Sequence, residues 1–182
     1  TMQRLPPADL AKMAGRTKEQ LDAVQRKMGR VPNLHATMAH SPAVLTAYLR
    51  LHDALSQTSL DNRLRELLAV TVASANDNEY CLSAHTAFGK NLKVDEAELM
   101  HAQEGESADP KTLAALRFVR SLVEKRGRVS DDEVAALKAA GFGNAAVMEI
   151  VASTVMNIFT NYCSHVAVTK VDFPRVRVPA AN

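Results

Sequence analysis

The chain has 182 residues, 47% of them hydrophobic, and its 22 basic and 20 acidic side chains leave a formal net charge of +2. This length suits one domain with a buried core, and two cysteines are too few for the disulfide framework of a small secreted protein. Charges of both signs are interspersed and no apolar run reaches the length of a membrane span, so we expect no binding to nucleic acid or membranes. The composition predicts a soluble, cytoplasmic protein.

Helical periodicity of the apolar residues begins after an N-terminal arm, residues 1–16. We expect the first four helices over residues 17–28, 33–39, 42–55 and from position 61 or 62 to about 75. The next helix carries Cys81 and His85 and is expected to fade at Gly89, because glycine is a poor helix former.

The second half of the chain continues in the same way. We expect helices over residues 94–103, 110–125 and 144–170, and Ser130 followed by Glu133 predicts a capping box that opens a further helix. The tail, residues 171–182, contains two prolines and is expected to lie extended on the surface. The sequence therefore predicts a single all-α domain, residues 1–182, of about eight helices.

A lone thiol and an imidazole share one helix face. Cys81 and His85 are four residues apart, and Asn76 or Asn78 can cap the helix just before Cys81. Glu66, on the preceding helix, is followed on its face by small apolar residues and is expected to point partly inward. A thiol near a helix N-terminus and beside a histidine has a lowered pKa, which we expect for Cys81. The alternative is a purely structural role, in which Cys81 packs in the core, His85 lies at the surface and Glu66 forms an ion pair with Arg63.

The C-terminal helix carries a polar stripe. Residues Glu149, Ser153, Asn157, Asn161 and His165 follow one another at intervals of four. Uncharged polar side chains on so apolar a helix favour an interior cleft or a subunit interface over an exposed strip. Cys163 is two residues, or about 200°, from its nearest stripe neighbours, so we predict a packed core thiol that faces away from Cys81. Because Cys163 and His165 cannot converge on one ion from an intact helix, we expect no metal site, and we expect no cofactor.

The spacing of these residues resembles a known family. Glu66, Asn78, Cys81 and His85 follow the frame Glu-x11-Cys-x2-Cys-x3-His of the peroxidases in the alkylhydroperoxidase D-like and carboxymuconolactone decarboxylase family, with asparagine at the first cysteine. The segments 29–33, 157–162 and 172–174 also resemble this family. The resemblance implies an AhpD-like helical bundle that assembles into trimers or hexamers. It also implies that the second cysteine attacks the peroxide, the first resolves the sulfenic acid, and glutamate and histidine relay protons.

The resemblance therefore implies a thiol-dependent peroxidase. Cys81 would be the nucleophile, Glu66 and His85 the proton relay, and an external thiol the reductant, since Asn78 replaces the resolving cysteine. The substrate would be a peroxide or a small organic acid. Further residues expected to line the site or bind substrate are Asn78, Tyr80, Asn157, Asn161 and His165.

Two alternatives stay open. The decarboxylase branch of the same family does not depend on a cysteine pair, and it would need a cation such as Arg63 or Lys90 to hold a substrate carboxylate. The second alternative is a non-catalytic helical oligomer, because Asn78 removes the resolving step.

Overall fold

The computed structural model describes residues 2–178, and this part of the chain is all-helical with no strand. A short 3-10 helix, Leu10–Lys12, precedes nine α-helices. These are α1 (Gly15–Met28), α2 (Asn33–Met38), α3 (Pro42–Leu55), α4 (Asn62–Ala75), α5 (Glu79–Asn91), α6 (Glu96–Gln103), α7 (Pro110–Glu124), α8 (Asp131–Ala139) and α9 (Asn144–Ala167). The all-α prediction is confirmed, with nine helices in the described residues where about eight were expected.

Local capping residues set most of the helix starts. Pro42 and Pro110 each occupy the first turn of their helices, and Ser130 and Glu133 form the predicted capping box at α8. The first helix starts at Gly15, inside the expected arm, and α9 ends at Ala167, before the expected boundary at 170.

The expected end of α5 at Gly89 is wrong, because the helix runs to Asn91. Gly89 is buried where α5 packs against α6, and a Cβ at this position would lie 2.7 Å from a methyl carbon of Leu99. Close packing of two helices therefore explains this glycine.

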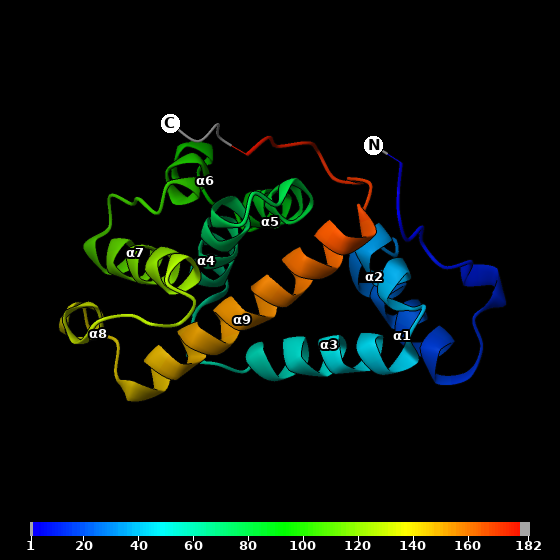
Figure 1. The fold of residues 1–182 in the computed structure, drawn as a ribbon, viewed down its shortest axis with the longest axis horizontal. Helices are drawn as coiled ribbons and strands as arrows, with labels where there is room; N and C mark the ends of the chain where they lie inside the picture. Colours follow the sequence, from blue (N-terminus) through cyan, green and yellow to red (C-terminus); the bar gives the residue numbers. More distant parts are fainter. Residues whose placement is uncertain (1, 179–182) are drawn as a thin grey trace.

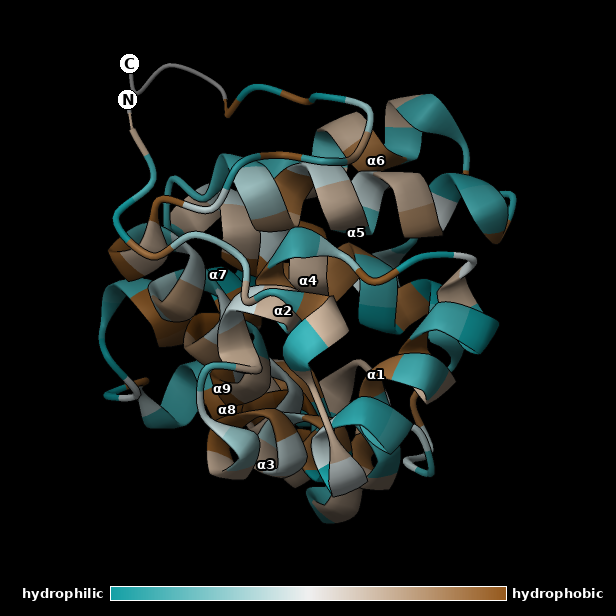
Figure 2. Ribbon diagram, turned by 90° about the vertical axis from the view of Figure 1, so that its right-hand side faces the viewer, coloured by the Kyte–Doolittle hydropathy of each residue, from teal (hydrophilic) through white to brown (hydrophobic). Residues whose placement is uncertain are grey.

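Two central helices organise the core. The fourth helix contacts α5, α6, α7 and α9, and α9 runs diagonally between the α1–α3 group and the α4–α8 group (Figure 1). Fully buried apolar side chains gather where these elements meet; they include Leu45, Leu67, Leu68, Leu82, Leu116 and Ile150. In Figure 2, α9 is coloured mainly as apolar and α1 mainly as hydrophilic.

The C-terminal segment lies extended along α5, as predicted for residues 171–178; residues 179–182 of the expected tail lie outside the described part. Arg175 forms a bidentate ion pair with Glu79, and the Val176 amide donates to the Ser83 hydroxyl at 2.9 Å. These contacts fix the tail over the helix that carries Cys81. No single described helix is long and apolar enough to span a membrane. Only α8 and α9 together reach that length and apolar composition, and they are bent by 115° relative to each other.

Candidate functional site

Cys81 lies in the first turn of α5, after the tight turn that follows α4. Asp77 adopts a left-handed backbone conformation (φ 52°), and Asn78 then caps α5 by accepting from the Cys81 amide at 2.8 Å. The Asn78 amide also donates to the main-chain carbonyl of Asn161 on α9 at 2.9 Å. Asn78, at the position of the family's first cysteine, therefore joins two helices, and its capping role confirms one of the two expected caps.

Glu66 and His85 form a direct pair between α4 and α5. The His85 Nδ1 atom lies 2.7 Å from the Glu66 carboxylate, and the two side chains are 21% and 22% exposed. We infer that Nδ1 carries the hydrogen, because a carboxylate only accepts. This leaves Nε2 of a neutral His85 free to take up a proton, which is the arrangement of a general base with an orienting carboxylate. The alternative pairing of Glu66 with Arg63 is wrong, since Arg63 pairs with Glu98.

Cys81 and His85 line the same small cavity, of about 40 Å³, beneath the C-terminal segment. Five helices or segments besides α5 contribute to its wall. The lining residues with polar or aromatic side chains include His35, Tyr48, Cys81, His85, Thr160 and Phe173. A water molecule needs about 10–15 Å³ of such space, so the cavity suits one to three water-sized groups, or hydrogen peroxide.

The lowered pKa expected for Cys81 is wrong. The side chain is 2% exposed, and burial raises the pKa of the thiol to about 11, although the neighbouring polar side chains of Asn161 and Thr160 act in the opposite direction. The Thr160 hydroxyl lies 3.8 Å from the sulfur. Loss of hydration disfavours the thiolate by more than Asn161 and Thr160 favour it, so Cys81 rests as a neutral thiol.

Neighbouring aromatic side chains extend the apolar surroundings of the thiol. Burial lowers the pKa of His35 to about 4, and it raises the pKa of Tyr48 above its usual range, with smaller contributions from Cys81 and Glu66. The two rings meet edge to face with centroids 5.4 Å apart. Sequence reasoning missed both residues and Thr160, because the cavity gathers them from α2, α3 and α9, and no motif spacing connects those helices.

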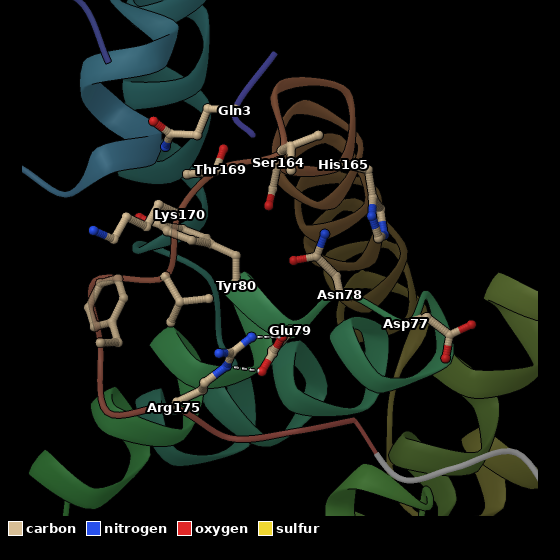
Figure 3. Close-up of a pocket in the computed structure, with 13 residues that line it drawn as sticks. Gln3, Asp77, Asn78, Glu79, Tyr80, Ser164, His165, Thr169, Lys170 and Arg175 are labelled. Carbon is tan, nitrogen blue, oxygen red and sulfur yellow. Dashed lines mark hydrogen bonds and ion pairs between the residues drawn. The ribbon is translucent and has the colours of Figure 1, made fainter. Parts of the chain in front are cut away.

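The remaining predicted site residues lie in two places, some at the pockets and the others buried along α9. Tyr80 lines both the small cavity and a larger surface pocket of about 580 Å³, which Asn78 and His165 also line (Figure 3). His165 donates to the Asn76 carbonyl at 2.9 Å, and Asn161 is fully buried beside the α4–α5 turn. Asn157 is buried and bonds to the Ser153 carbonyl of its own helix at 2.9 Å.

Two further predictions, on the polar stripe and on Cys163, have clear outcomes. The polar stripe is interior at Ser153, Asn157 and Asn161, but His165 lies at the surface. Cys163 is half-buried at the edge of the core instead of fully packed, because the last turns of α9 reach solvent, and it is not disulfide-bonded to Cys81.

The two cations considered for a substrate carboxylate lie elsewhere. Arg63 is engaged by Glu98, and Lys90 lies 2.6 Å from Glu96. Neither lines either pocket. Within residues 2–178, no three histidine, cysteine or acidic side chains converge as a metal site would require.

Comparison with known proteins supports one fold and one family. Residues 42–121 match the carboxymuconolactone decarboxylase family. A peroxidase-related protein with an alkylhydroperoxidase AhpD core from Ralstonia eutropha JMP134 is 25% identical, with a TM-score of 0.86 over 94% of this chain and 93% of that one. A peroxidase-related protein from Silicibacter sp. TM1040 is 23% identical, with a TM-score of 0.80 over 93% and 94% of the two chains.

The debrominase Bmp8 has the same fold, with 19% identity and a TM-score of 0.80 over 93% of this chain and 92% of its own. No curated protein matches the sequence. The family match, the shared fold and the Glu66–His85 pair beside Cys81 agree: the chain has the AhpD-like fold, and residues 42–121 are similar to the carboxymuconolactone decarboxylase family.

Proposed function

We propose that the protein is a thiol-dependent peroxidase that acts on small hydroperoxides through Cys81. The observation that carries the proposal is the 2.7 Å contact between Glu66 and His85, with His85 and Cys81 on the wall of one small cavity. A neutral thiol becomes a nucleophile when a neighbouring base takes its proton.

The proposed first step transfers one oxygen atom. Nε2 of His85 takes the thiol proton, directly or through one water molecule, and the Cys81 sulfur attacks the outer oxygen of the peroxide. The O–O bond breaks, the sulfur is oxidised to a sulfenic acid, and the leaving oxygen receives the proton from His85 as an alcohol or water. Glu66 keeps the imidazole in the required orientation and stabilises its charged form.

The sulfenic acid then needs an external reductant. The first monothiol would form a mixed disulfide with Cys81 and release water, and a second monothiol would release Cys81 as a thiol with formation of a small disulfide. Asn78 cannot perform this step, because an amide has no sulfur to form a disulfide with Cys81; its side chain instead joins α5 to α9. A reducing cytoplasm, as the sequence predicts, would supply such thiols.

The size of the cavity favours the small end of the substrate range. Pockets for drug-sized molecules usually measure about 300–1,000 Å³, whereas this one has about 40 Å³. A halogenated aromatic compound, as in the complex of a Bmp8 variant with 2,3,4-tribromopyrrole, would require the wall to open at Phe173. The decarboxylase alternative agrees with the family match, but it lacks the cation expected for a substrate carboxylate, because Arg63 and Lys90 are both engaged by glutamates away from the cavity.

Peroxide consumption in the presence of glutathione tests the proposal. We expect turnover by the wild type and by Cys163→Ser, and none by Cys81→Ser. Absence of turnover together with absence of any peroxide-dependent change at Cys81 would favour the non-catalytic alternative.

We also propose a homo-oligomer whose interface includes α9. Four exposed apolar side chains recur on this helix at intervals of seven, seven and four residues; they are Met148, Val155, Tyr162 and Val166, with 56–65% exposure. This is the spacing of a coiled-coil seam, which an identical helix of a second copy can complement. A trimer or hexamer is the expected assembly.

A further inference from the structure

An amide group without a hydrogen-bond acceptor lies buried beside Cys81. The side chain of Asn161 is fully buried, and its Oδ1 atom accepts from the Asn76 amide at 2.9 Å. Its Nδ2 atom is buried and has no partner among the residues that the structure describes. Buried donors are nearly always paired, so an unpaired one in this position points to an acceptor that is absent from the resting state.

Two contacts fix the direction of this donor. Asn76 holds the oxygen of the Asn161 side chain, so the nitrogen must point away from Asn76. Asn78 binds the Asn161 main-chain carbonyl and also caps the Cys81 amide, which holds this turn of α9 against the first turn of α5. The neighbouring residue Thr160 approaches the Cys81 sulfur to 3.8 Å.

This turn of α9 lies at the sulfur, because Thr160 approaches it and Asn78 ties the Asn161 main chain to the start of α5. In keeping with this placement, the Asn161 side chain is the strongest influence that lowers the pKa of Cys81, ahead of Thr160, against the larger effect of burial. A neutral thiol is a weak acceptor, which explains why Nδ2 is unpaired in the resting protein. A thiolate, or the oxygen of a sulfenate, is a strong acceptor for the same donor.

We propose that Nδ2 of Asn161 stabilises the negative charge on Cys81 as the thiol loses its proton and attacks the peroxide, and that Asn76 is a positioning residue for it. This inference rests on the proposed function of Cys81. It assigns the three asparagines of this region different tasks: Asn78 builds the turn, Asn76 orients the amide, and Asn161 donates to the reacting sulfur.

The surroundings of the sulfur leave few other sources of positive charge. No lysine or arginine is among the described residues that line the cavity. The titratable groups around Cys81 are His35 of α2, Tyr48 of α3, Glu66 of α4, Tyr80 and His85 of α5, and Cys163 of α9. His35 is neutral at pH 7 because burial lowers its pKa to about 4, so only protonated His85 could oppose the charge of a thiolate. A neutral amide donor in this apolar cavity therefore has a large effect on a thiolate.

The test compares alkylation of Cys81 by iodoacetamide at pH 9 in a Cys163→Ser background. We expect Asn161→Leu to slow the reaction by about tenfold to a hundredfold, since it removes a hydrogen bond to a charged group. Thr154→Val is the matched control: Thr154 is fully buried on the same helix, and its hydroxyl donates to the Ile150 carbonyl at 2.8 Å, away from the cavity. This control should react at the wild-type rate. A purely structural role for Asn161 predicts the opposite sign, because looser packing exposes the thiol and speeds alkylation.

A rate for Asn161→Leu equal to or above that of the control overturns the inference. If Asn161→Leu does not fold, Asn76→Ala takes its place in the test, because it removes only the contact that orients the Asn161 amide. A several-fold slower alkylation of Cys81 in this variant supports the inference, and an unchanged rate overturns it. The assay contains no peroxide, so it separates the two proposals. A wild-type protein that is alkylated but never oxidised by peroxide would contradict the proposed function, and the variant series would still measure the donor.

Discussion

The most specific prediction concerns the pH dependence of Cys81 alkylation. Burial raises the pKa of this thiol to about 11, so about one molecule in 10,000 carries the thiolate at pH 7. A free cysteine with a pKa near 8.5 is about 3% thiolate at the same pH. The difference predicts that Cys81 reacts at least about 300-fold more slowly than an exposed cysteine at pH 7, before any steric effect of burial.

The alkylation rate of Cys81 should increase with pH over a wide range. Because the thiolate is the reacting form, the rate should rise about tenfold per pH unit from pH 7 to about pH 10 and level off only near pH 11. The assay is iodoacetamide labelling of the Cys163→Ser variant, followed by mass spectrometry of the peptide with Cys81, and a model cysteine peptide serves as the control. A plateau below pH 9 would refute the reasoning, because it would mean that the helix N-terminus and His85 outweigh burial.

Three further predictions follow from the packing around the site. Asn78→Ala should lower the free energy of unfolding by about 2 kcal/mol, because it removes a helix cap and the bond to Asn161; urea denaturation beside the exposed control Asn62→Ala measures this, and equal stabilities would contradict it. Phe173→Ala should speed Cys81 alkylation several-fold at fixed pH, since this ring packs on Tyr80 and Phe88 and lines both pockets; an unchanged rate would show that the thiol is reached by another route. Val155→Lys should shift the protein toward the monomer in light scattering, and an unchanged mass would exclude this face of α9 as the interface.

Local signals in the sequence were enough for most of the fold. Ser130 with Glu133 predicted the start of α8, and the asparagines before Cys81 predicted the start of α5, because caps act within one turn of the chain. The predicted end of α5 at Gly89 was wrong for the opposite reason. The role of this glycine depends on Leu99 of the next helix, and packing between helices cannot be predicted from local propensity.

The site was predictable only in part. Spacing placed Cys81 and His85 on one face and brought Glu66 into register, and the structure joins Glu66 to His85. The state of the thiol was not predictable, because its burial depends on Thr160 and on the extended segment around Phe173, which reach it from the far end of the chain. Side chains that come together from separate helices have no fixed spacing in the sequence, so a motif cannot predict that they share a site.

The central claim is that His85 activates Cys81 toward peroxide. The most direct test follows sulfenic acid at Cys81 with a dimedone probe after addition of hydrogen peroxide at pH 7, in the Cys163→Ser background with and without His85→Gln. We expect labelling of Cys81 in the presence of His85, and a rate at least about 100-fold lower without it, the usual contribution of a general base. Equal rates in the two proteins, or no peroxide-dependent labelling of Cys81 in either, would contradict the account.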